Sequence, residues 1–216
     1  MASIKLKHAT GNSTIIHSPA ANPSSDVTLN LPSTSGSAGQ VLKVASANHS
    51  STNAELEFGA DAGGKFASYA IICDQKGTNT AGGSSSTGAF NTRDLNTELS
   101  DSDGIVTIGS NQFTLQAGSY LIKANAPSHK GLRHQILIWN ATDSSIVAVG
   151  TSEYSNQSST TTSRAFATGR TTISGAKAFE IRHRCENAQS GNGLGVESNY
   201  DTLASIYTIV EIYKES

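Results

Sequence analysis

Charged residues are scarce in this sequence. They make up 15% of the 216 residues, and 15 Lys and Arg set against 17 Asp and Glu leave a formal net charge of −2. A protein that binds a nucleic acid backbone needs a concentrated basic surface, which neutralises phosphates and releases their counterions. This composition offers no such excess, so we expect no nucleic acid partner.

Long apolar runs and a secretory signal are also missing. No run reaches the roughly 18 consecutive apolar residues of a membrane-spanning helix, and the first residues, MASIKLKHAT, lack the apolar centre of a signal peptide. We therefore expect synthesis in a cytoplasm and no membrane insertion. Asn-X-Ser/Thr triplets begin at Asn12, Asn48, Asn140 and Asn156, but their glycosylation requires a secretory route.

The sequence has only two cysteines, Cys73 and Cys185. Two are too few for a disulfide framework, and both lie in strand-like segments, so we expect buried free thiols. Cys185 shares one face of the expected strand AKAFEIRHRCE with His183. Two ligands do not make a metal site, and a half-buried structural histidine is the better interpretation. We therefore expect no metal and no cofactor.

The segment DSDG, residues 101–104, is a fragment of a calcium-binding loop. A complete loop needs further oxygen ligands and a closing Glu at a set spacing, which IVTIGSNQ does not provide. We expect a turn in which Asp side chains accept hydrogen bonds from the local backbone. The sequence also lacks a nucleophile elbow, a zinc-binding HExxH and a phosphate-binding loop, so we predict no catalytic residue and no enzymatic activity.

Ser, Thr, Asn and 20 Gly take the place of the missing charges. This composition favours short strands and turns over helices. In residues 113–124, apolar and polar side chains largely alternate, with the period of two that puts one face of a strand on a core. Gly118 can take the positive φ of a tight turn, so we expect a β-hairpin centred on it.

Strand-like segments recur from Tyr69 to the carboxyl-terminal residues, and turn residues separate them. We expect about eight to ten strands, which is typical of an antiparallel sandwich. The last segment, SIYTIVEIY, is apolar on both faces, so each face needs a cover. We expect Ile206, Thr208, Val210 and Ile212 to face the core and Tyr207, Ile209 and Tyr213 to face outward.

Residues 1–62 differ in style from the remainder. Short strand-like segments such as DVTLNLP and QVLKVAS alternate with stretches rich in Gly, Ser and Asn. Each is too short to bury much surface alone, so we interpret residues 1–62 as a small β-rich attachment segment and residues 63–216 as the main domain. A flexible polar linker is the alternative interpretation of residues 1–62.

The segment FTLQAGSYLIKA resembles the central hairpin of complement-type and tumour-necrosis-factor-like trimeric jelly rolls, and the order of strand segments extends this resemblance over residues 66–216. The resemblance implies an all-β fold, an antiparallel jelly-roll sandwich, assembled as a homotrimer. Such families use the closing strand at the threefold axis, so Tyr207, Ile209 and Tyr213 become the candidates for contacts between protomers.

The segments MASIKLKHATGNS, DVTLNLPSTSGSAGQVLKV and ELEFG resemble the amino-terminal parts of tail-fibre and head-appendage proteins of tailed bacteriophages. The resemblance implies a virion structural protein, made in the host cytoplasm, that binds other virion proteins through residues 1–62. Two roles remain open: a short fibre or appendage for host attachment, and a capsid decoration protein that stabilises the head shell. A glycan-degrading fibre enzyme is a third alternative.

Loops of the main domain are the expected recognition sites, because cores and protomer contacts are expected to occupy the strand faces. Tyr, Asn and basic side chains there suit stacking on sugars, hydrogen bonds to hydroxyls and contact with anionic polymer. The partner implied is a host surface glycan, and solvated turns are the alternative. The candidate contact residues are Lys130, Arg133, Tyr154, Asn156, Asn192 and Tyr200.

Overall fold

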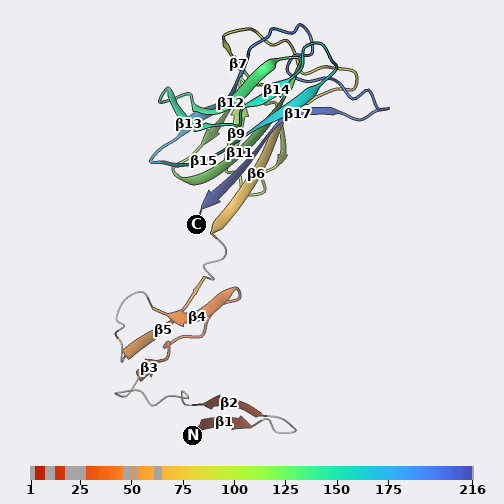
Figure 1. The fold of residues 1–216 in the computed structure, drawn as a ribbon. Helices are drawn as coiled ribbons and strands as arrows, with labels where there is room; N and C mark the ends of the chain where they lie inside the picture. Colours follow the sequence, from red (N-terminus) through yellow and green to blue (C-terminus); the bar gives the residue numbers. More distant parts are fainter. Residues whose placement is uncertain are drawn as a thin grey trace. The chain divides into compact units, whose positions relative to one another are not determined.

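The computed structural model describes residues 3–7, 13–17, 28–45, 50, 53–60 and 65–215 (Figure 1). The chain divides into two compact units, Met1–Ala62 and Gly63–Ser216. All regular elements of the described residues are strands. No helix in these ranges is long and apolar enough to cross a membrane.

The larger unit is built from two antiparallel sheets. The β17 sheet has the strand order β15-β11-β17-β6-β8, and the β12 sheet has the order β13-β12-β16-β10-β9, with β14 paired to β12 and β7 paired to β16. In chain order the strands are β6 (Phe66–Lys76), β7 (Phe90–Thr92), β8 (Thr97–Ser100), β9 (Val106–Gly109), β10 (Gln112–Leu115), β11 (Gly118–His129), β12 (Leu132–Asn140), β13 (Ser145–Val149), β14 (Glu153–Ser155), β15 (Thr162–Ile173), β16 (Lys177–Cys185) and β17 (Ser205–Glu215).

The chain crosses repeatedly from one sheet to the other. β10 lies in the β12 sheet, β11 in the β17 sheet and β12 again in the β12 sheet, and the same alternation recurs from β15 through β16 to β17. This connectivity between two antiparallel sheets is that of a jelly roll. The predicted all-β fold class with an antiparallel jelly-roll sandwich is therefore confirmed.

One core fills the space between the sheets. Alternate residues of each strand point inward, as the period of two requires. The rings of Phe113 on β10 and Phe179 on β16 stack with their centroids 5.6 Å apart. The other large apolar side chains that are fully buried here include Ile72, Leu115, Tyr120, Ile122, Ile136, Ile138, Ile181 and Ile212.

The expected hairpin around Gly118 is wrong. β10 and β11 lie in different sheets and do not pair, whereas β9 pairs with β10. The turn of that hairpin is Ser110-Asn111, with φ of 53° and 61°, as a two-residue hairpin turn requires. Gly118, with φ of 152°, marks the passage between sheets. Two strands that face one core show the same alternation whether they pair or cross, so the pattern alone could not separate the two cases.

The pattern expected for the last strand is wrong in part, because β17 contains a bulge. The register with β6 shifts between Ile206 and Ile209, and a bulge changes which side chains face inward. Thr208, Val210 and Ile212 are buried as expected, but Ile206 is 39% exposed. Tyr207 is only 3% exposed within its own chain, and its hydroxyl donates to the carbonyl of Thr80 at 2.7 Å.

The smaller unit contains paired strands with little core. β1 (Ser3–Lys7) pairs with β2 (Ser13–His17), and β5 (Asn53–Ala60) pairs with both β3 (Thr28–Asn30) and β4 (Gln40–Val44). In the described ranges Ala45 is the one buried apolar residue of this unit. Five larger apolar side chains are between 41% and 76% exposed, namely Leu29, Leu31, Val41, Leu42 and Val44. A single copy of this sheet therefore leaves its apolar side chains uncovered.

Candidate functional site

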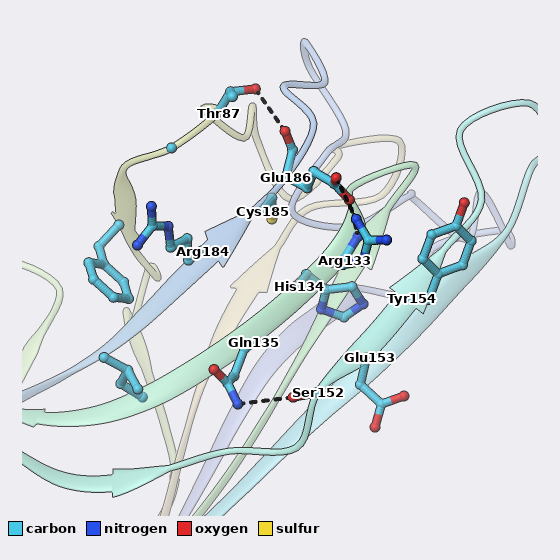
Figure 2. A pocket seen from close by; sticks show the side chains of 13 residues that line it. Thr87, Arg133, His134, Gln135, Ser152, Glu153, Tyr154, Arg184, Cys185 and Glu186 are labelled. Carbon is cyan, nitrogen blue, oxygen red and sulfur yellow. Dashed lines mark hydrogen bonds and ion pairs between the residues drawn. The ribbon is translucent and has the colours of Figure 1, made fainter.

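A groove of about 1080 Å³ lies over the outer surface of the β12 sheet (Figure 2). Its floor comes from β12 and β16, and its sides come from β7 and from the segment around β14. These four strands are neighbours in the order β7-β16-β12-β14. The lining residues are Thr87, Gly88, Phe90, Arg133, His134, Gln135, Leu137, Ser152, Glu153, Tyr154, Arg184, Cys185 and Glu186.

Strand register brings an aromatic ring, a guanidinium and an amide into one line across the floor. Phe90 lies opposite Arg184, and Arg184 lies opposite Gln135. Directly opposed residues on neighbouring antiparallel strands project from the same face of a sheet. Tyr154 lies opposite Arg133 on the far side of β12. Figure 2 shows Arg184 on one side of the groove and Tyr154 on the other.

The two groove arginines differ in their partners. Nη1 of Arg133 donates to Oε1 of Glu186 at 2.8 Å, and the backbone N–H of Arg133 donates to Oε2 of the same carboxylate at 3.2 Å. The Arg184 guanidinium lies 5.8 Å from the centroid of the Phe90 ring. In the part of the chain that the structure describes, no carboxylate pairs with Arg184.

The middle of the groove is held in place by hydrogen bonds. Nε2 of Gln135 donates to the carbonyl of Gly150 at 2.8 Å and to the Ser152 hydroxyl at 3.3 Å. Tyr154 is 55% exposed. A fixed amide between two exposed aromatic rings gives a polar floor with apolar sides, which is the composition expected of a small ligand site.

A second arginine and aromatic pair extends the same face. The Arg182 guanidinium lies 4.1 Å from the centroid of the Trp139 ring and also pairs with Glu180. The positive charge of Arg182 is therefore balanced by a carboxylate of the same chain. Such cation–π contacts fix the guanidinium plane against the ring.

A buried polar cluster lies beneath the groove. Nδ1 of His134 and Nε2 of His183 are 3.0 Å apart, and Nε2 of His134 is 2.8 Å from the Ser163 hydroxyl. Burial lowers the pKa of His134 to about 4 and lowers the pKa of His183 well below its ordinary value. Burial also raises the pKa of the Cys185 thiol. The histidines are therefore neutral near pH 7 and the cysteine is a thiol, so the charge of the groove comes from its Arg and Glu side chains.

A buried arginine, Arg93, joins the two sheets, and its backbone N–H donates to the Ile181 carbonyl on β16 at 2.8 Å. Its guanidinium is fully buried and donates to the Thr208 hydroxyl at 2.8 Å and to the carbonyls of Pro127 and Leu194 at 3.3 and 2.6 Å. Burial lowers its pKa to about 10, which keeps it charged at neutral pH. His183, expected to be half-buried, is instead fully buried, and its Nδ1 has no hydrogen bond partner in the described residues.

Two predictions about the cysteines and the DSDG segment are confirmed. Cys73 and Cys185 are buried free thiols. The Asp101 carboxylate accepts hydrogen bonds from the backbone N–H groups of Ile105 and Val106, both at 2.9 Å, so its oxygens close a turn. Within residues 65–215 and the other described ranges, no group of three or more His, Cys, Asp or Glu residues is placed to hold a metal ion.

Comparisons with known proteins give structural likeness only. No protein-family model matches the chain, and no curated protein matches it. Among solved structures, murine APRIL at pH 5.0 aligns at 6% identity over 68% of this chain and 98% of that one, with a TM-score of 0.43. The globular domain of zebrafish complement 1qA aligns at 12% identity over 68% and 95%, with a TM-score of 0.41. PRD1 vertex protein P5 aligns at 11% identity over 71% and 100%, with a TM-score of 0.47. These low identities and TM-scores carry no conclusion about function.

The structure brings together two of the six candidate ligand contacts. Arg133 and Tyr154 line the groove, and the other four lie outside its lining. The Asn156 side chain accepts a hydrogen bond from the Ser158 N–H within its own turn, and Asn192 accepts one from Gln189. Tyr200 is exposed on a separate loop. Lys130 occupies a turn with φ of 54°.

Phe90, Gln135 and Arg184 are the groove residues that sequence reasoning missed. The strand pattern puts Arg182 and Arg184 on the outward face of β16, but cores and protomer contacts were expected to occupy the strand faces. In this single chain the outward face forms the floor of the groove. The alternation of Arg182 and Arg184 with buried neighbours was the available signal, whereas the pairing of β7 with β16 joins residues too distant in sequence to be foreseen.

Two of the three candidate protomer contacts are accessible. The Tyr213 ring lies 5.3 Å from the ring of Phe66 and 6.5 Å from that of Tyr69, measured between centroids, and together they form an aromatic cluster on the outer face of the β17 sheet. Ile209 is partly buried. Tyr207 is buried in its own chain, so its side chain offers almost no surface to a neighbour.

Proposed function

We propose that this chain is a virion surface protein of a tailed bacteriophage whose jelly-roll unit binds a glycan on the host surface. Residues 1–62 attach it to other virion proteins, and three copies associate through the outer face of the β17 sheet. The groove over the β12 sheet is the binding site. The phage assignment is supported by the amino-terminal sequence resemblance, and the binding role is supported by the groove itself.

The observation that carries the binding role is the set of side chains that line the groove. Exposed Phe90 and Tyr154 offer flat apolar surfaces that stack on sugar rings. Gln135, Arg133 and Arg184 offer donors and acceptors for hydroxyl and acidic groups. An open groove with a few fixed polar groups suits part of an extended polymer.

Binding without cleavage is the proposed outcome. Glycoside hydrolysis uses two carboxylates that flank the scissile bond. Of the two groove glutamates, Glu186 is paired with Arg133, which indicates a structural role. Glu153 lies opposite His134 in the register of β12 with β14, whereas Tyr154 lies opposite Arg133. Glu153 also lines the groove, so among the described lining residues it is the one carboxylate that has no ion-pair partner.

Uncovered apolar surfaces support the two association roles. Phe66, Tyr69 and Tyr213 form an aromatic cluster on the β17 sheet, in which Phe66 is 39% exposed and Tyr69 is 50% exposed, and such clusters mark contacts between proteins. Val41 and Val44 are exposed on β4, an edge strand that can also pair its backbone with a partner.

A glycan array tests the proposed function. The labelled full-length protein is applied to immobilised bacterial surface polysaccharides, together with the double variant Phe90→Ala/Tyr154→Ala and the control Tyr200→Ala. We expect the wild type and the control to bind the same glycans. We expect the double variant to bind them at least about tenfold more weakly. If the wild type binds no glycan but still binds phage heads that lack it, the role is capsid decoration instead.

A further inference from the structure

The groove has one positive charge that the protein leaves without a partner. The Arg133 and Arg182 guanidinium groups pair with Glu186 and Glu180. Arg184 has no acidic partner in the described residues, and its guanidinium contacts only the Phe90 ring among charged and aromatic groups. A guanidinium is charged at every physiological pH, and its planar N–H fork matches a carboxylate in two parallel hydrogen bonds.

From this arrangement we infer that the groove selects a glycan whose sugars carry a carboxylate, such as a uronic acid polymer, and that Arg184 binds that carboxylate. The inference rests on the proposed glycan-binding function and names the class of its ligand. The acidic group pairs with Arg184, the ring carbons stack on Phe90 or Tyr154, and the hydroxyls meet the Gln135 amide.

The positions of the two glutamates agree with one acidic group at Arg184. The Glu186 charge is already balanced by Arg133 at 2.8 Å. Glu153 lines the groove from β14, whereas Arg184 lies on β16, on the other side of β12. His134 beneath the floor is buried and neutral. The lining therefore has two arginines and two glutamates, and a single carboxylate at Arg184 suits it better than a densely charged polyanion.

A glycan fits this floor better than an acidic peptide or a nucleic acid. Extended peptides gain affinity by pairing with a free strand edge, but β12 and β16 are already paired on both sides where they form the floor. A nucleic acid needs several cations along its backbone. One unpaired arginine between two exposed aromatic rings meets neither requirement.

The test compares two probes that differ at the carboxyl group, a galacturonate tetramer with free carboxylates and its uncharged methyl ester, by calorimetric titration of the full-length protein. We expect the wild type to bind the acid about tenfold more tightly than the ester, because a hydrogen bond to a charged group is stronger than one to a neutral group. Arg184→Gln removes this preference, and Arg184→Lys keeps the charge without the fork and retains part of it.

Arg170→Gln is the control, because Arg170 is exposed on the β17 sheet and its substitution changes the net charge by the same amount. It leaves the preference for the acid intact. Equal binding of acid and ester by the wild type, or an unchanged preference in Arg184→Gln, overturns the inference. The inference is also overturned if neither tetramer binds the wild type, or if polyglutamate at equal carboxylate concentration displaces the bound tetramer.

The array result separates failure of this inference from failure of the proposed function. If the protein binds the array's neutral glycans through Phe90 and Tyr154 and shows no preference for acidic ones, the inferred carboxylate specificity is wrong and the proposed glycan binding stands. If the protein binds no glycan at all, both the carboxylate inference and the proposed glycan-binding function are wrong. The thermal midpoints of all variants, compared with the wild type, exclude misfolding as the cause of a loss.

Discussion

His134 and His183 form a buried pair inside the sandwich. Their ring nitrogens are 3.0 Å apart, so one ring donates to the other and both remain neutral. Arg93 adds a positive charge that lowers the pKa of both histidines further. Among the described residues, no carboxylate accepts a hydrogen bond from either ring, so none would directly stabilise a protonated histidine here.

This pair predicts a loss of stability in mild acid. The unfolded chain protonates both histidines below about pH 6.5, while the folded chain keeps them neutral, so the free energy of unfolding falls by about 1.4 kcal/mol per pH unit for each histidine. The contribution is complete above that pH, and for His134 the loss continues down to about pH 4. Urea unfolding at a series of pH values measures this slope.

His134→Gln provides the comparison. The substitution removes one of the two protonation sites, so the slope between pH 6 and pH 5 falls by about half. Asp74, whose pKa burial raises, contributes with the opposite sign but is present in both proteins. A variant with the slope of the wild type would show that His134 is not one of the groups responsible.

The positions of single strands in this fold were easier to predict than which strands pair with one another. The strands of both units fall where apolar side chains alternate, because burial of one face dictates that pattern locally. Pairing depends on residues far apart in sequence, such as Phe90 and Arg184. The hairpin expected at Gly118 was wrong for this reason. The groove could not be foreseen for the same reason, because its floor needs β12 and β16 and its sides need β7 and β14.

The passage between sheets at Gly118 predicts a cost for any side chain there. A Cβ on this residue would lie 3.2 Å from the Tyr120 ring and 3.3 Å from Cε of Lys214, at a φ of 152°. Gly118→Ala therefore lowers the free energy of unfolding by about 1 to 2 kcal/mol. Gly175→Ala is the matched control, since a Cβ there meets nothing within 4 Å. Equal effects of the two substitutions in urea unfolding would contradict this explanation.

At the scale of the whole molecule, the two sheets present different outer surfaces. The β12 sheet has a groove lined by arginines and aromatic residues, and the β17 sheet has the cluster of Phe66, Tyr69 and Tyr213. In the proposed trimer the second surface is covered by neighbouring copies and the first stays open. Three open grooves on one such trimer would convert weak binding at each site into useful avidity.

This division predicts how charge substitutions affect the oligomeric state. The full-length protein is expected to have a mass in solution of three times the 22.4 kDa chain. Tyr69→Glu combined with Tyr213→Glu introduces like charges into the covered surface and shifts the mass toward one chain. Tyr154→Glu, in the groove, leaves it unchanged. Light scattering after size exclusion distinguishes these results, and a wild-type mass of one chain would remove the trimer from the proposal.

The place of β17 has a consequence for synthesis. It lies between β11 and β6 in the middle of its sheet, so the first and last strands of the jelly-roll unit are neighbours. A growing chain that has not yet produced Ser205–Glu215 leaves β6 and β11 as two unjoined edges. The unit therefore completes its fold only after translation has passed β17, and a product truncated before Ser205 lacks the central strand of this sheet.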